Sequence, residues 1–231
     1  MFEQRSTDLE YMDRPDFSAK GVADTFRFLV PVNRLFGGIR PTIAFLESEA
    51  ATWDPCRTYA ILDVGSGAGD VAAALARWAS KSGHSVLIRA IDSHPSSVAA
   101  ARERVKTFAN ITVDEANALS VGGIYDYVHA SQFLHHFADD QVPSVLRHLQ
   151  SLCRRTVIVN DLLRSPVHYA AAWLLTLFSN EVFRHDARLS IRRGFRLAEL
   201  GELLRSNGFS EYTLLEGFFY RFLLALRGTG E

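Results

Sequence analysis

A group of glycines and carboxylates near residue 65 is the part of this chain best suited to bind a ligand. Two carboxylates flank three alternate glycines and a serine: Asp63, Gly65, Ser66, Gly67, Gly69 and Asp70. Glycine has no Cβ, so such a turn lets the backbone approach a bound molecule closely. The apolar run before the turn and the alanine-rich run after it predict a buried parallel strand and a helix.

A second acidic position follows in the run Val86–Pro95, which is typical of another buried strand. This strand ends in Asp92, with Ser93 next to it, about twenty residues beyond the last glycine. Nucleotide-binding sheets use a carboxylate at this place to hold the hydroxyls of a ribose. The two stretches therefore fit either a dinucleotide such as NAD or S-adenosylmethionine (SAM).

The charges around the turn favour SAM over NAD. The dinucleotide fingerprint is G-x-G-x-x-G, whereas here the glycines alternate between Asp63 and Asp70. These carboxylates would repel a pyrophosphate and attract the ammonium and sulfonium groups of SAM. We predict that Asp63 and Asp70 orient the turn or the amino group of SAM, and that Asp92 binds its ribose.

Composition narrows the class of protein. The 231 residues, 48% of them hydrophobic, can bury one sizeable core with an appendage. A net charge of −1 disfavours nucleic acid as a partner. Cys56 and Cys153 form no CxxC pair, which favours a reduced, cytoplasmic protein without a metal held by sulfur. The polar N-terminus and the short apolar runs predict neither a secretory signal nor a membrane span.

Segment boundaries predict an N-terminal arm and cap at residues 1–54, followed by a binding domain at 55–231. Residues 1–18 are polar and are expected to form a loosely held arm. Apolar residues recur at helical spacing from 19 to 51, and Pro31 and Pro41 divide this segment into two or three helices. These helices either cap the ligand or simply cover the sheet.

The remainder alternates strands with helices, which predicts a parallel sheet with right-handed crossovers. Further strands are expected at 111–113, 125–130, 155–160, 211–215 and 218–224, and helices at 95–106, 139–152 and 197–207. A helix inserted at 162–178, begun by Pro166, lies in a region at 164–193 that we expect to form the substrate pocket.

The motifs D-V-G-S-G-A-G-D and A-I-D-S-H-P resemble those of the class I SAM-dependent methyltransferases. The resemblance continues to about residue 224 and is similar to bacterial small-molecule enzymes of the quinone and polyketide-tailoring kind. It implies an α/β, Rossmann-like fold with a mostly parallel seven-stranded sheet and an antiparallel last strand. Asn117 and Ala118 resemble the site that meets the adenine ring, where the family usually has an acid. Ser131 and Gln132 follow the strand under the cofactor.

Methyl transfer from a sulfonium is an in-line displacement, so positioning supplies much of the catalysis. A phenolic acceptor also gains from a base that takes its proton near neutral pH, for which histidine is suited. The candidates are His135 and His136 after the fourth strand and His168 on the inserted helix. For any one of them a structural role is the more common outcome, but as a set they favour a base.

A second group of residues could orient a phenolate or carboxylate: Asp161, Arg164, Tyr169, Arg188 and Arg193. No metal is expected, because the histidines lack ligand spacing and Asp161 stands alone at its strand tip. Aromatic residues around these positions indicate a flat, hydrophobic acceptor or an ordinary core.

The sequence thus predicts a SAM-dependent methyltransferase of secondary metabolism that methylates oxygen on a small aromatic or polyketide-like acceptor. The alternatives are a C-methyltransferase of the quinone-biosynthesis kind, an NAD-dependent oxidoreductase, and a SAM fold that has lost catalysis and serves a partner. The oligomeric state stays open, with a homodimer compatible with the sequence.

Overall fold

Seven strands form the centre of the molecule in the computed structural model, which describes residues 2–14, 17–36, 38–217 and 219–231. The strands are β1 (Thr58–Val64), β2 (Ser85–Asp92), β3 (Ile111–Glu115), β4 (Tyr125–Ser131), β5 (Cys153–Leu162), β6 (Tyr212–Gly217) and β7 (Arg221–Arg227). All of β4 except Ser131 is buried, as expected of a parallel strand covered on both faces.

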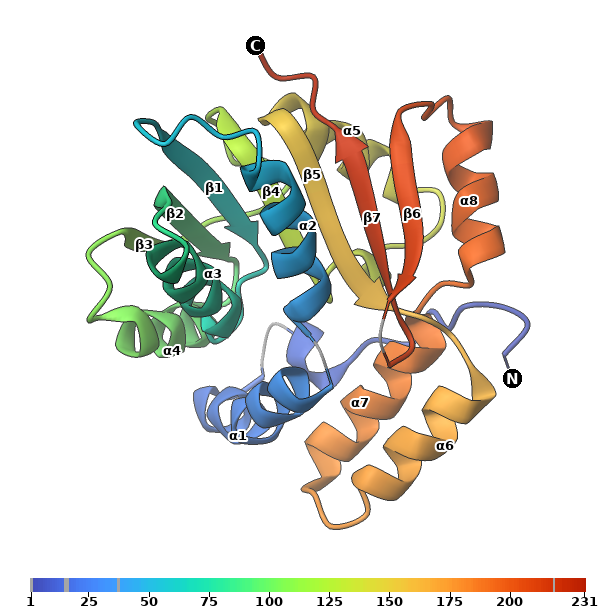
Figure 1. The fold of residues 1–231 in the computed structure, drawn as a ribbon. Helices are drawn as coiled ribbons and strands as arrows, with labels where there is room; N and C mark the ends of the chain where they lie inside the picture. The colour runs from blue at the N-terminus through green and yellow to red at the C-terminus, as the bar shows by residue number, and fades with distance from the viewer. Residues whose placement is uncertain (1, 15–16, 37, 218) are drawn as a thin grey trace.

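The strands lie in the order β3-β2-β1-β4-β5-β7-β6 (Figure 1). β1 pairs in parallel with β2 and β4, whereas β7 pairs antiparallel with both β5 and β6. The predicted α/β fold with antiparallel pairing at its end is therefore confirmed. The chain order reverses between β1 and β4, and sheets of this kind bind ligands beyond the carboxyl ends of their strands at that point.

Helices cover both faces of the sheet. One face carries α2 (Arg40–Ala50), α3 (Asp70–Lys81) and α4 (Pro95–Val105), and the other carries α5 (Val142–Ser151) and α8 (Leu197–Ser206). Each face has its own apolar cluster, with Leu75 of α3 in one and Leu146 of α5 in the other, both fully buried. The resulting core fixes the strand ends on which the site is built.

The N-terminal segment is held firmly, so the expectation of a loose arm is wrong for the described residues 2–14. Arg5 donates hydrogen bonds to the carbonyl oxygens of His135, Phe137 and Arg193 at 3.0, 2.9 and 2.6 Å. A short 3-10 turn, Tyr11–Asp13, follows the buried side chain of Glu10. The polar sequence of this segment gives no sign of these contacts, because its partners lie more than a hundred residues away.

The next segment forms α1 (Ala19–Leu35) and α2, within the predicted number of helices, but the first division is misplaced. α1 continues through Pro31, contrary to the expectation that the helix ends there. Pro41 lies in the first turn of α2, where a missing N–H has no intrahelical partner to lose. The division of the chain into units at 1–54 and 55–231 stays a prediction.

The insertion after β5 consists of α6 (Pro166–Leu175) and α7 (Glu181–Arg193), which pack on each other. The pair projects below the sheet beside α1 in the view of Figure 1. Ser165 caps α6 by accepting a hydrogen bond from the Val167 N–H, so Pro166 begins the helix as predicted. In the described ranges, no helix is long and apolar enough to cross a membrane.

The closing hairpin is shifted toward the C-terminus relative to the prediction. The last strand begins at Arg221 rather than at Phe218, which lies outside the described residues. Phe219 and Tyr220 both have φ of 56°, and left-handed backbone cannot continue a strand. This turn is what brings Arg221 to the end of the sheet.

Candidate active site

A cavity of about 820 Å³ lies where β1, β2 and β4 end, within the size range of small-molecule sites. The loops after these strands form its floor, and α1, α6, α7 and residues 10–14 form its walls. The site therefore combines the glycine turn with segments from both ends of the chain.

The glycine turn follows β1 in the chain, and its backbone is hydrogen-bonded to the end of β2. Gly65 has φ of 63°, and a Cβ there would lie 2.8 Å from the Phe133 ring, so a side chain does not fit. Gly67 has φ of 51° and donates its N–H to Asp92 Oδ2 at 2.9 Å. Both residues line the cavity, which places bare backbone next to any ligand bound there.

Asp92 is fixed by backbone donors on both carboxylate oxygens. Its Oδ1 accepts the His94 N–H at 2.9 Å, opposite the Gly67 bond to Oδ2. Burial raises the pKa of Asp92, although these two hydrogen bonds oppose the effect. Because a carboxylate oxygen has two lone pairs, each oxygen keeps one for the hydroxyls of a ligand.

Two buried polar atoms beside the turn lack a partner among the described residues. Asp63 is 1% exposed and binds His129 Nδ1 through Oδ1 at 2.8 Å, which leaves its Oδ2 unpaired. The Ser66 hydroxyl is likewise unpaired. Unpaired buried polar atoms are rare, and both residues line the cavity. A ligand with a positively charged donor fits this position.

All but one of the predicted cofactor residues line the cavity. Besides those described above, they are Asp70, Ser93, Asn117, Ala118, Ser131 and Gln132. Gly69 does not: it precedes α3 and faces Ala101 and Val105. Asn117 Oδ1 accepts the Leu119 N–H at 2.8 Å, so its amide nitrogen remains as a donor. Burial raises the pKa of Asp70.

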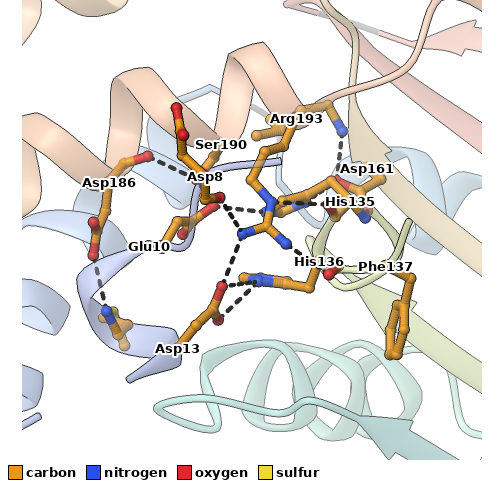
Figure 2. Close-up of polar contacts among 12 residues, drawn as sticks. Asp8, Glu10, Asp13, His135, His136, Phe137, Asp161, Asp186, Ser190 and Arg193 are labelled. Carbon is orange, nitrogen blue, oxygen red and sulfur yellow. Dashed lines mark hydrogen bonds and ion pairs between the residues drawn. The ribbon is translucent and has the colours of Figure 1, made fainter. Parts of the chain in front are cut away.

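His135 is enclosed by two carboxylates from distant parts of the chain (Figure 2). Its Nδ1 lies 2.7 Å from Asp161 Oδ1, and its Nε2 lies 3.4 Å from Glu10 Oε1. Burial opposes protonation, but the two carboxylates outweigh it and raise the pKa of His135 to about 9. At neutral pH this side chain is therefore a cation rather than a base.

Asp161 lies behind His135 and is not part of the cavity wall. Burial acts to raise the pKa of this carboxyl, but His135 and two backbone N–H groups overcome that and lower it to about 2. The expected contact between Asp161 and the acceptor is therefore not met. Asp161 contacts His135, and it is His135 that lines the cavity.

His136 lines the cavity and pairs with Asp13, its Nδ1 lying 2.9 Å from Oδ1 (Figure 2). Arg193 Nη1 lies 3.1 Å from the other oxygen of Asp13. Glu10, His135 and His136 offer ligand atoms within 4.8 Å of one another, a grouping that could hold a metal ion. Ligand spacing in the sequence could not show this grouping, because Glu10 comes from the N-terminal segment.

His168, on α6, is the histidine whose protonation state suits a base. It is 7% exposed and lines the cavity, and its Nδ1 lies 3.1 Å from the Leu163 carbonyl oxygen. Burial, with a smaller contribution from the Arg221 charge, lowers the pKa of His168 to about 4 against the opposing hydrogen bond. The ring is neutral at neutral pH, and its Nε2 has no hydrogen-bond partner among the described residues.

The two buried arginines predicted to orient the acceptor have structural partners instead. Arg164 binds both carboxylate oxygens of Glu199 at 2.6 and 2.7 Å, besides three carbonyl oxygens. Arg193 donates to the carbonyl oxygens of His135 and His136 at 3.1 and 2.6 Å. Neither side chain lines the cavity.

Tyr169 and Arg188 also lie away from the cavity wall. The Tyr169 ring packs edge-on against Phe2, and Arg188 donates to the Trp173 carbonyl oxygen at 3.2 Å across the α6–α7 pair. The expectation that these side chains contact an acceptor is not met, because the insertion turns them toward its own helices.

The cavity residues that sequence reasoning missed include three that bear on the site's charge: Glu10, Asp13 and Arg221. The first two lie in a segment whose polarity gave no sign of burial. Arg221 did carry a signal, since it is a lone charge within the apolar run Phe218–Leu224. A charge that is buried in such an apolar run is rare unless it is paired or used.

Residues 61–156 match the family model described as a methyltransferase domain. A comparison with curated proteins gave no match.

Several solved structures share the fold. Magnesium protoporphyrin IX methyltransferase from Synechocystis PCC 6803, with bound SAM, is 19% identical, with 96% of this chain and 100% of that one covered at a TM-score of 0.63. A SAM-dependent methyltransferase from Aquifex aeolicus is 16% identical, with coverages of 93% and 100% and a TM-score of 0.63. The plantazolicin methyltransferase BamL, in complex with a triazolic desmethylPZN analog and S-adenosylhomocysteine (SAH), is 17% identical, with coverages of 90% and 75% and a TM-score of 0.64.

Proposed function

We propose that this chain is a class I SAM-dependent methyltransferase, since residues 61–156 match the methyltransferase domain model, and that it methylates a phenolic or hydroquinone oxygen of a small aromatic or polyketide-like acceptor. The observation that carries this proposal is the neutral His168 on the wall of the cavity, next to apolar side chains of α6 and α7. A phenol has to lose its proton during O-methylation, and a neutral imidazole can take it.

The residues around the glycine turn fit SAM by their chemistry. Asp92 would hold the ribose hydroxyls, while the unpaired oxygens of Asp63 and Ser66 would accept hydrogen bonds from the ammonium group. Asn117 and Ala118 would lie against the adenine. When bound, SAM supplies an electrophilic methyl group on a positively charged sulfur, which the carboxylates of this region favour.

The acceptor half of the cavity would hold a flat ring against apolar side chains. These come from α1, α6, α7 and the loop after β4: Leu29, Phe133, Phe137, Ala172, Leu175 and Phe183. Holding the acceptor oxygen against the methyl group would lower the barrier through orientation.

His168 would accept the phenolic proton at Nε2, because its Nδ1 is committed to the Leu163 carbonyl oxygen. With a pKa of about 4, this ring is a weak base in the free protein. A weak base suffices, since the phenolic oxygen becomes far more acidic as its bond to the methyl carbon forms. His135, as a buried cation, would favour loss of the phenolic proton.

One observation favours a second candidate, methylation at a ring carbon. A cation at His135 stabilises a phenolate, and a phenolate can attack through carbon as well as through oxygen. The two outcomes differ in the bond formed, so they can be separated directly.

The proposal is tested first by calorimetric titration with SAH, with NADH as the control, and then by product analysis. Phenols and hydroxyquinones would be incubated with SAM labelled with ¹³C in its methyl group, and the products examined by NMR. We expect a methoxy signal. A new C–CH₃ signal would favour the second candidate, whereas tight SAH binding without methylation of any phenol would count against both.

A further inference from the structure

Arg221 is a buried charge in the cavity wall that no acid among the described residues neutralises. It is 4% exposed and lines the cavity, yet among the described residues no carboxylate lies within ion-pair distance of its guanidinium. Its Nη2 donates to Asn33 Oδ1 at 3.0 Å, and its Nη1 has no partner in the described parts of the chain. Asn33 also accepts a hydrogen bond from Gln132 Nε2 at 2.7 Å, so this single amide oxygen is shared.

A comparison with Arg164 shows how unusual this arrangement is. Arg164 is equally buried, but it is neutralised by a bidentate pair with Glu199 and by carbonyl oxygens. Burial lowers the pKa of Arg221 to about 10 against the weak opposing fields of Asp161 and Asp70, so the group remains charged at neutral pH. A buried charge without a partner is strongly unfavourable, and a guanidinium pairs best with a planar carboxylate.

The position of Arg221 favours the acceptor over the cofactor as the source of that carboxylate. Arg221 opens β7, where it pairs with Leu162 of β5, whereas the ribose carboxylate Asp92 ends β2. In the sheet order β2-β1-β4-β5-β7 four strand intervals separate the two, which is about 19 Å at 4.8 Å for each interval. The charge of Arg221 lowers the pKa of His168, on the acceptor side of the cavity, and also acts to lower the pKa of Asp70 beside the glycine turn.

We propose that Arg221 binds an anionic group of the acceptor, so that the substrates are phenols that also carry a carboxylate. This inference rests on the proposed function and narrows it to aromatic hydroxy acids. A carboxylate held by the guanidinium would add to the Asn33 contact or displace it, and would fix the ring with its hydroxyl toward His168. Arg221 then determines specificity, while the methyl transfer itself uses other residues.

The test measures binding to SAH-saturated protein by calorimetry. The probes are 4-hydroxybenzoate, 2-hydroxybenzoate and 6-hydroxy-2-naphthoate, each paired with its neutral methyl ester. We expect the wild type to bind at least one acid tenfold or more tightly than its ester. Arg221→Met should abolish this preference and leave ester binding within about threefold, and Arg221→Lys should retain part of it because it keeps the charge.

Arg164→Met is the matched control, since it removes an arginine of the same burial outside the cavity. It should lower the melting temperature and leave the acid preference intact. Arg221→Met, which removes an unpaired charge, should have a melting temperature at or above that of the wild type. If Arg221→Met does not fold, the acid preference is measured in Arg221→Lys and Arg221→Gln instead.

Two results would overturn the proposal. A tenfold loss of SAH affinity in Arg221→Met would assign the arginine to the carboxylate of the cofactor instead. Equal affinity of the wild type for each acid and its ester would show that no acceptor carboxylate is recognised. A wild type that binds none of the acids or esters would count against the proposal in the same way. Methylation of neutral phenols in that case would leave the proposed function standing without this refinement.

Discussion

At the scale of single residues, charge distinguishes the glycine turn from the rest of the cavity. Asp63, Asp70 and Asp92 line the cavity around the turn. The cations His135 and Arg221 lie across the ends of β4, β5 and β7, where Glu10 and Asp13 also line the cavity. A positively charged cofactor would therefore meet charges of the opposite sign at the turn.

Asp92→Ala tests the cofactor side. Hydrogen bonds to a charged group contribute about 1.5–3 kcal/mol, so we expect SAH affinity to fall roughly 10- to 150-fold. The measurement is calorimetric titration with SAH, together with thermal melting to show that the turn held by Gly67 and His94 stays folded. Asp114→Ala, which removes a partly exposed ion pair with Arg89, should leave SAH binding unchanged. Unaltered affinity in Asp92→Ala would remove the ribose assignment.

Two buried histidines with opposite pKa shifts set the pH dependence of stability. The folded pKa of His135, about 9, is above its ordinary value of 6.5, so its contribution is full below pH 6.5 and is lost as the pH rises through 9. The folded pKa of His168, about 4, is below that value, so unfolding takes up a proton and stability falls from pH 6.5 toward 4. We expect the melting temperature to be highest near pH 6.5.

Single substitutions test which histidine causes each of the two slopes in this profile of melting temperature against pH. His135→Gln should flatten the fall in melting temperature between pH 6.5 and 9, and His168→Gln should flatten the fall between pH 6.5 and 4. A profile that keeps both slopes in the two variants would contradict the protonation states on which the proposed roles rest.

At the scale of elements, the cavity depends on segments outside the strand–helix alternation. α1 contributes Asn33, residues 2–14 contribute Glu10 and Asp13, and α6 contributes His168. The N-terminal segment is held by Arg5 and by Ser190 of α7, whose hydroxyl donates to Glu10 Oε1 at 2.8 Å (Figure 2). The acceptor half of the cavity is thus assembled from the two ends of the chain.

Pro31 provides a test of α1 as an element. Proline in a helix interior costs about 3 kcal/mol relative to alanine, and Pro31 is exposed, so its ring contributes little packing. We expect Pro31→Ala to raise the free energy of unfolding by about 1–3 kcal/mol, measured by urea denaturation. Pro41→Ala, in the first turn of α2, is the control and should be close to neutral. A loss of stability in Pro31→Ala would mean that α1 needs its bend.

At the scale of the whole molecule, the tip of the α6–α7 pair is unusually apolar. Its exposed side chains include Phe178 at 98%, Leu174 at 63%, Leu175 at 55% and Trp173 at 47%. Clustered exposed apolar side chains favour association. We predict that a homodimer, which the sequence left open, would form through this surface.

We expect the protein to self-associate with rising concentration, and Phe178→Ser to weaken that association at least tenfold. Light scattering coupled to size-exclusion chromatography measures the mass directly. Leu87→Ser, on β2 at an exposure similar to that of Leu174, should have no such effect. A monomeric wild type at all concentrations would contradict the expectation.

The sequence alone determined the sheet, its helices and the gathering of the residues around the glycine turn at one cavity. These depend on local signals: short branched runs for buried strands, and the glycine turn between Asp63 and Asp70. The carboxyl ends of neighbouring parallel strands meet at one edge, so the sequence pattern by itself places Asp92 beside the turn. Element ends were less certain, as Pro31 and the closing hairpin show, because tertiary contacts override local preferences there.

Only the tertiary structure decided which side chains form the acceptor half. His135 becomes a cation because Asp161 and Glu10, from β5 and the N-terminal segment, converge on it. Arg164 and Arg193 become structural because their acceptors lie on other segments, while Arg221 reaches the cavity with a guanidinium nitrogen unpaired among the described residues. Charge, burial and partner depend on contacts between residues far apart in the chain, and no local pattern in the sequence encodes those contacts.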